Sequence, residues 1–235
     1  MRKNPAKVFI LCVLSISLLS SCVVTEKLTL GEGLSGKSHA DIFVDDFFVG
    51  VVEDLSNWDS RGSEDPILEV AVKDVKAKLE SSDTASSVNF REAGHNTYVG
   101  DFAFSDFEKL IADISGRQTE QRIVKVTERD NKTRIDISIN MDNYEQLTHI
   151  IPFLADPNFE VYGPLYNNSL TKEEYLEMVS FILGEQCPES ITNSSIKLQF
   201  VTSKAIINHN GKLRNPKTVE FSFPLIDFLL LHNSI

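Results

Sequence analysis

Cysteine is scarce in this sequence of 235 residues. The three cysteines are Cys12 in a short apolar run, Cys22 just after that run, and Cys187 alone in the remaining chain. A disulfide-rich scaffold and a zinc site built on paired cysteines are therefore excluded. Because Cys187 has no partner cysteine in the expected folded part, stability must come from core packing. We expect Cys187 to be a small apolar side chain in that core.

Basic residues are in the minority. The chain has 23 Lys and Arg residues against 34 Asp and Glu residues, which gives a formal net charge of −11. A surface of this sign repels both nucleic acid and anionic lipid. We therefore expect no nucleic-acid partner, and no anionic lipid surface as the main partner.

Catalytic and metal-binding motifs are missing as well. The five histidines do not form a motif such as H-E-x-x-H, and no G-x-S-x-G elbow occurs. Acidic pairs occur at Asp45-Asp46 and Glu173-Glu174. Both pairs stand where helices are predicted to begin, and stabilisation of a helix N-terminus explains them better than acid–base catalysis does. We expect no enzymatic activity, no cofactor and no metal, while a zinc site assembled from distant residues stays open.

No apolar run is long enough to cross a membrane. The N-terminal run, residues 8–19, is shorter than the roughly 20 residues that a spanning helix requires. The apolar tail, residues 224–231, is shorter still and is expected to join the core. Three basic residues, Arg2, Lys3 and Lys7, precede the N-terminal run without any acid. This layout is typical of a secretory signal.

The residues at the end of this run indicate the type of signal. Leu19-Ser20-Ser21-Cys22 resembles the lipobox of bacterial lipoproteins, in which an aliphatic residue and two small residues precede a cysteine. The resemblance implies cleavage before Cys22, a diacylglycerol on its thiol and acylation of the new amino group. Two or three acyl chains anchor a protein stably. The predicted lipidation site is therefore Cys22, and the membrane is a predicted partner.

The same resemblance divides the chain into a signal peptide, residues 1–21, and a single extracytoplasmic domain, residues 22–235. It implies a place in the cell envelope, facing the periplasm or the cell exterior, with inner and outer membrane both open. The signal removes three basic residues and no acid. The mature domain would therefore be more acidic than the whole chain.

Helical and strand patterns alternate along the domain without the strand-helix-strand rhythm of a parallel sheet. Asp65-Pro66, Ser105 to Glu108 and Thr171 to Glu174 carry helix-start signals, the last two as capping boxes. Helices are predicted from residue 46, over 66–79, 106–114, 142–151 and 172–182. Strands are predicted over 23–30, 88–90, 98–104, 123–126, 134–139, 196–201, 205–207 and 219–223. The fold class is therefore α+β, with an antiparallel or mixed sheet built from hairpins and helices packed on one face.

One stretch matches a phosphate-binding motif. Residues 31–38 read G-x-x-x-x-G-K-S, in which the loop and Lys37 would hold phosphates and Ser38 a magnesium ion. A phosphate loop must lead into a helix, whereas residues 39–44 have an extended pattern. We therefore interpret residues 31–36 as a Gly-rich turn.

Aromatic residues leave the function open. The sequence has 15 Phe residues, six of them near expected strand–helix junctions, where they form either ordinary core or the lining of an apolar cavity. The lipobox, the early strand with its Gly-rich turn and the final strand Phe221 to Leu225 resemble LppM-type lipoproteins. That topological resemblance implies an anchored domain that binds lipid, but it assigns no binding residues. Two hypotheses follow: a binding module for an apolar or lipid-like envelope ligand, and a structural or protein-interaction lipoprotein without a pocket.

Overall fold

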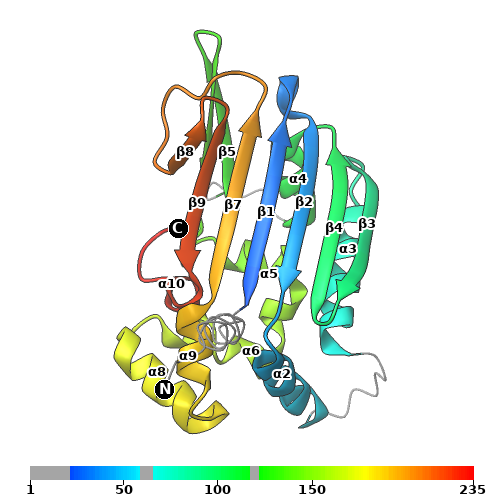
Figure 1. Cartoon of the computed structure of the whole chain (residues 1–235). Coiled ribbons are helices and arrows are strands. Elements are labelled where there is room, and N and C mark those ends of the chain that lie inside the picture. Colours follow the sequence, from blue (N-terminus) through cyan, green and yellow to red (C-terminus); the bar gives the residue numbers. More distant parts are fainter. Residues whose placement is uncertain (1–21, 59–65, 117–121) are drawn as a thin grey trace, which may run out of the picture.

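Seven strands form one mixed sheet. The computed structural model describes residues 22–58, 66–116 and 122–235 (Figure 1), so the predicted signal peptide lies outside the described residues. The sheet has the strand order β3-β4-β2-β1-β7-β9-β8, and β5 and β6 form a separate hairpin. The strands are β1 Val23–Leu30, β2 Gly36–Phe43, β3 Ala85–Gly94, β4 Thr97–Phe104, β5 Val124–Arg129, β6 Lys132–Ile137, β7 Ser195–Thr202, β8 Lys212–Asn215 and β9 Thr218–Pro224.

The helical elements are short. They are η1 Glu32–Leu34, α2 Asp46–Trp58, α3 Ile67–Glu80, α4 Phe107–Ile114, α5 Tyr144–Ile150, η2 Pro152–Ala155, α6 Pro157–Glu160, α7 Pro164–Asn167, α8 Lys172–Leu183, α9 Cys187–Asn193 and α10 Leu225–Leu230. Within the described residues, no helix combines the length and the apolar character that crossing a membrane requires.

Strand pairing confirms the predicted fold class. All neighbouring strands of the large sheet are antiparallel except β1 and β7, which run parallel. The hairpins β3–β4 and β5–β6 correspond to the two predicted from the sequence. The parallel pair joins segments about 170 residues apart, and it makes the sheet mixed.

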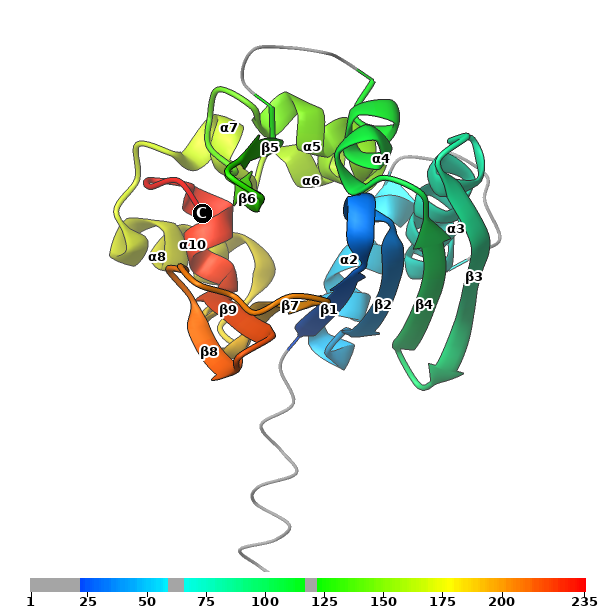
Figure 2. The same cartoon turned by 90° about the horizontal axis from the view of Figure 1, so that it is seen from above.

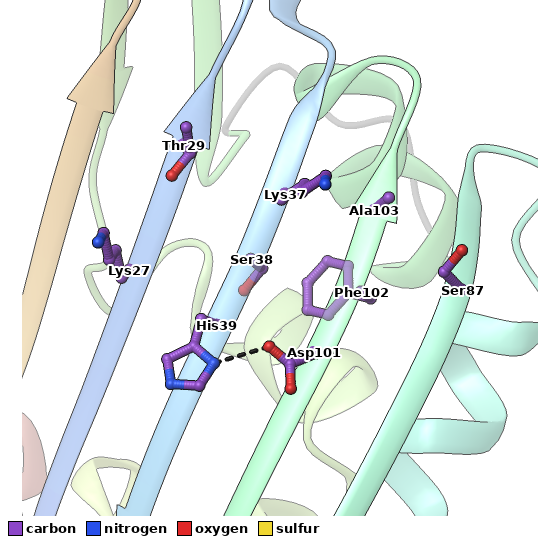
Figure 3. Close-up of a pocket in the computed structure, with 9 residues that line it drawn as sticks. All are labelled: Lys27, Thr29, Lys37, Ser38, His39, Ser87, Asp101, Phe102 and Ala103. Carbon is purple, nitrogen blue, oxygen red and sulfur yellow. Dashed lines mark hydrogen bonds and ion pairs between the residues drawn. The ribbon is translucent and has the colours of Figure 1, made fainter.

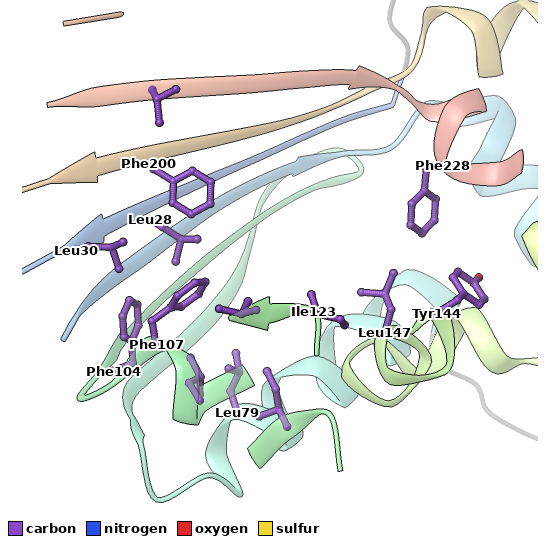
Figure 4. Packing of buried hydrophobic residues seen from close by; sticks show 14 of the residues in the cluster. Leu28, Leu30, Leu79, Phe104, Phe107, Ile123, Tyr144, Leu147, Phe200 and Phe228 are labelled. Atoms are coloured by element: carbon purple, nitrogen blue, oxygen red, sulfur yellow. The ribbon is translucent and has the colours of Figure 1, made fainter. Parts of the chain in front are cut away.

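The main core lies between the sheet and its helical layer. Helices α3, α4 and α5 and the β5–β6 hairpin lie on one face of the sheet (Figure 2), and no described element covers the other face. Leu28, Phe104 and Phe200 point from the sheet toward the helical layer, which contributes Phe107 of α4 and Leu147 of α5 (Figure 4). Much of the predicted aromatic surface therefore packs into ordinary core.

A second apolar cluster lies where helices gather beyond the sheet. Tyr175 and Val179 of α8 pack with Cys187 and Ile191 of α9 and with Ile226 of α10. Cys187 has no exposed surface, which confirms its predicted role as a core side chain. Burial raises the pKa of its thiol to about 11, so the thiol stays protonated at neutral pH. The apolar tail also joins the core, as predicted, through α10.

Helix caps test the predicted helix starts. Thr171 and Glu174 form the predicted capping box of α8. The capping box predicted at Ser105 is wrong, because Asp106 caps α4 by accepting the Lys109 N–H. Glu108 instead accepts the Val126 N–H of the adjacent hairpin. Helix α5 begins after Asn143 rather than after the predicted Asp142. The predicted cap Asp65 lies outside the described residues.

The strand predicted over residues 205–207 is absent. Strand β7 ends at Thr202, whose hydroxyl donates to the Lys204 carbonyl, and the Ile206 N–H then bonds to the Pro216 carbonyl outside any strand. Ile207 is 73% exposed, so its apolar side chain does not indicate a core strand. The edge strand β8, which pairs with the outer side of β9, begins instead at Lys212. Its charged residues gave no strand pattern in the sequence.

Candidate functional site

The uncovered face of the large sheet carries a row of polar side chains. Strand register places one such residue on each of the seven strands, each directly opposite its neighbours. Directly opposed residues point to the same face of a sheet. In spatial order the row is Asn89, Asp101, His39, Lys27, Gln199, Glu220 and Lys212. The row contains acidic groups (Asp101 and Glu220) as well as basic ones (His39, Lys27 and Lys212), so this face offers both charges to a partner.

His39 is held between two carboxylates within this row. Its Nδ1 lies 2.7 Å from Asp101 Oδ1 (Figure 3). Its Nε2 lies 3.3 Å from Asp41 Oδ2. The hydrogen bond to Asp101 raises the pKa of the imidazole above its ordinary value, and Asp41 acts in the same direction. All three side chains are about half-exposed, so water screens these contacts.

A hollow of about 450 Å³ opens beside His39. Lys27, Lys37 and Thr29 line one side, and Asp101 and Ser87 line the other (Figure 3). The polar groups include donors on the lysines and acceptors on the carboxylate. A second hollow between α4, α5 and β5 has room for about 10 Å³, no more than one water molecule. The larger space is thus on the open polar face.

Glu220 forms a second charged contact on this face. Its carboxylate accepts hydrogen bonds from the guanidinium of Arg214 on β8. This contact holds the pKa of Glu220 below its ordinary value, and Lys212 and Lys197 contribute attraction. The carboxylate therefore stays charged at neutral pH, and the row keeps both signs of charge.

We expect Asp101→Asn to lower the pKa of His39, because the substitution removes the strongest contact that favours the imidazolium. Asp41→Asn is the matched comparison and should lower this pKa less, since its contact is longer. The raised pKa means that His39 stabilises the folded state below its ordinary pKa of about 6.5, and this contribution disappears as pH rises through the folded value. An NMR titration of the imidazole measures both shifts. Equal pKa values in all three proteins would contradict the contact.

Cys22, the predicted lipidation site, lies at the start of β1. Its carbonyl accepts the Ser195 N–H at 3.1 Å, and its sulfur lies 3.4 Å from the Asp45 N–H at the start of α2. The side chain is partly exposed, and burial raises the pKa of the thiol to about 11. Strand pairing begins at Val23, so no linker separates Cys22 from the folded domain.

The Gly-rich motif forms the turn that the sequence predicts. Residues Glu32–Leu34 make a single 3-10 turn between β1 and β2, and the chain continues as a strand rather than a helix. Lys37 is exposed on the open face, whereas the Ser38 hydroxyl donates to the carboxylate of Glu26 on the helix-covered face. The two residues lie on opposite faces of the sheet, so they cannot act together on a phosphate and its magnesium ion.

Glu26 places a carboxyl group on the helix-covered face of the sheet, where most neighbours are apolar. Burial raises the pKa of its carboxyl, and the Ser38 hydrogen bond only partly opposes this effect. Because the folded state holds the proton more tightly, stability is fully retained below the unfolded pKa of about 4.3 and falls as pH rises through the folded value. The burial of Glu26 was not predicted from the sequence. The available signal is its spacing of two and four residues from Leu28 and Leu30, which puts all three on one face of β1.

We expect Glu26→Gln to stabilise the domain by roughly 1 kcal/mol at pH 7, because an amide keeps the hydrogen bond without a buried charge. The gain should vanish near pH 3, where Glu26 is protonated in both states. Urea denaturation at the two pH values measures it, and Glu32→Gln on the exposed turn is the matched control. A gain that does not depend on pH would contradict the explanation.

The two acidic pairs serve helix starts, as predicted. Asp45 accepts the Phe47 N–H, and Glu174 belongs to the capping box of α8. Asp46 also contacts His95 and Asn96 in the β3–β4 turn. Within residues 22–58, 66–116 and 122–235, no three His, Cys, Asp or Glu side chains gather as metal ligands do. The open-face row was not predicted, because its members are far apart in the sequence.

Comparison with known proteins assigns no family to this chain. No family model matches the chain, and no curated protein matches it. Among solved structures, it is similar to the NMR structure of the folded domain of LppM from Mycobacterium tuberculosis. The two share 10% sequence identity with a TM-score of 0.35, and the alignment covers 87% of this chain and 82% of that chain. Similarity at this level assigns neither a residue role nor an activity to this chain.

Proposed function

We propose that this chain is a non-enzymatic lipoprotein of the cell envelope, anchored through Cys22, which binds a protein partner through the open face of its sheet. The observation that carries the proposal is the row of polar side chains across all seven strands of the uncovered face. Its acidic and basic groups and the hollow beside His39 suit a protein surface that also bears both charges.

The position of Cys22 fits an anchor. The residue after it enters the sheet directly, so acyl chains on Cys22 would hold the domain close to the membrane. A thioether sulfur remains a weak acceptor, so acylation permits the contact with the Asp45 N–H. The partly exposed side chain gives the lipid a way out of the fold.

Metabolic labelling with an alkyne fatty acid tests the anchor. We expect the full chain expressed in a bacterium to take up the label and to sediment with membranes. Cys22→Ala should lose both properties. Cys12→Ser is the matched control and should keep both, because the predicted cleavage removes position 12. Label retained in Cys22→Ala would contradict the proposed anchor.

Photo-crosslinking in intact envelopes tests the binding face. A photoreactive amino acid at Thr29, on the open face, should give a discrete protein adduct, whereas the same group at the exposed Glu53 of α2 should not. Lys27→Glu should reduce the Thr29 adduct at least fivefold because it reverses a charge in the row. Lys172→Glu on α8 is the matched control. Identical adducts from both positions would refute the assignment of this face.

The alternative is an apolar or lipid-like ligand bound without a covalent bond. Native mass spectrometry of the acylated chain distinguishes the two functions. A second lipid of defined mass at near-unit stoichiometry would favour the ligand-binding alternative. The mass of the acylated chain alone, unchanged after incubation with envelope lipids, would favour the protein-binding function.

A further inference from the structure

The last turn of α8 presents two large apolar side chains to solvent. Phe181 is 91% exposed and Ile182 is 54% exposed. The side of the helix opposite Phe181 is fixed, since Tyr175 and Val179 are buried in the second apolar cluster, and Ile182 follows them just beyond the end of that buried side. The outward position of Phe181 therefore follows from the packing of α8 and not from a loose terminus.

This turn lies at the end of the molecule that holds Cys22. Helices α8 and α9 lie beyond the end of the sheet where β1 and β7 begin (Figure 1). After α9 the chain enters β7 at Ser195, whose N–H donates to the Cys22 carbonyl at 3.1 Å. A helix as short as α9 spans only about 10 Å, so the corner between α8 and α9 stays close to Cys22.

We propose that Phe181 and Ile182 insert into the membrane that holds the lipid on Cys22. This inference rests on the proposed lipid anchor. An anchor without a linker keeps this end of the domain at the bilayer surface, where apolar side chains enter the outer 5–10 Å. Two contacts, the acyl chains and this corner, fix the orientation of the domain better than one does.

The charges near the corner define the kind of membrane surface. Three carboxylates are exposed here: Glu177 on α8, Glu185 between the two helices and Glu189 on α9. Anionic headgroups would repel these carboxylates, and zwitterionic headgroups would not. The apolar corner therefore suits a membrane surface that is neutral on average.

Quenching by brominated lipid tests the insertion. The full acylated chain is placed in phosphatidylcholine vesicles with Phe181→Trp introduced in a Trp58→Phe background, since Trp58 is the single tryptophan. Ile207→Trp in the same background is the matched control, because Ile207 is 73% exposed and follows the far end of β7. We expect at least threefold stronger quenching at position 181. Half of the lipid replaced by anionic phosphatidylglycerol should weaken it.

The outcomes separate the two proposals. A chain whose mass lacks the acyl groups overturns both the anchor and the insertion. An acylated chain with equal quenching at both positions overturns only the insertion. Blue-shifted emission at position 181 in detergent and in vesicles alike, without lipid quenching, points to a protein contact and also overturns it. Hydrogen–deuterium exchange of the unsubstituted chain is a second measurement, and amides 180–186 should exchange more slowly on vesicles than in detergent.

Discussion

Gly36→Ala is expected to destabilise the domain by at least about 3 kcal/mol, because β1 and β2 leave no space for a side chain at this position. A Cβ atom there would lie 2.1 Å from the Thr29 carbonyl oxygen and 2.8 Å from the Phe104 ring. The oxygen belongs to the backbone of the paired strand, so a side-chain rotation cannot relieve the clash. The first residues of β2 would have to separate from β1 or shift Phe104 out of the core.

Gly50→Ala is the matched control. Gly50 is exposed on α2 and has nothing within 4 Å of the added Cβ position. Alanine should stabilise a helix at such a position by up to about 1 kcal/mol. Urea denaturation followed by circular dichroism measures both variants. Similar stabilities for Gly36→Ala and the unsubstituted chain would contradict the steric role of Gly36.

The result also bears on the Gly-rich motif. Its glycines and lysine match a phosphate loop in sequence, but Gly36 is required by the close approach of Thr29 and Phe104. A steric requirement predicts loss of stability without any ligand. A phosphate-binding role would instead predict nearly unchanged stability and a loss of nucleotide affinity.

Local signals in the sequence were sufficient for many elements. A strand was predicted over residues 23–30, where β1 lies, and the Thr171 capping box predicted the start of α8. Each signal lies within a few residues of the structure that it specifies. The two wrong predictions are also local: Asp106, next to Ser105, is the cap of α4, and β7 ends at Thr202, before residues 205–207.

The candidate site required information that the sequence does not express locally. The open-face row depends on the parallel pairing of β1 with β7, which brings Lys27 opposite Gln199. No single strand reveals which of its polar residues will stand beside a lysine of another strand. The exposure of Phe181 was not predicted either, because an apolar residue in an amphipathic helix is ordinarily assigned to the core. Its exposure follows from the packing of Tyr175 and Val179 on the other side of α8.

Tyr175→Ala is expected to cost about 4 kcal/mol, because the aromatic ring fills the centre of the second apolar cluster. Tyr175 is 1% exposed, and its hydroxyl donates to the Tyr162 carbonyl at 2.7 Å. Without the ring, α8 keeps only Val179 as a fully buried side chain in the cluster that it shares with α9 and α10. Hydrogen exchange should then accelerate first in α8 and α9, and less in the sheet, because the main core between the sheet and α4 is unchanged.

Tyr175→Phe distinguishes the contribution of the buried ring to stability from that of the hydroxyl group. It keeps the packing and leaves the Tyr162 carbonyl without its donor, so we expect a loss of about 1 kcal/mol. Tyr166→Ala is the matched control on α7, and at 63% exposure it should change stability by less than about 0.5 kcal/mol. Thermal and urea denaturation measure the free energy of unfolding of the three variants and so rank their stabilities. If Tyr175→Ala were as stable as Tyr166→Ala, the second cluster would not hold α8, and the fixed outward position of Phe181 would lose its structural basis.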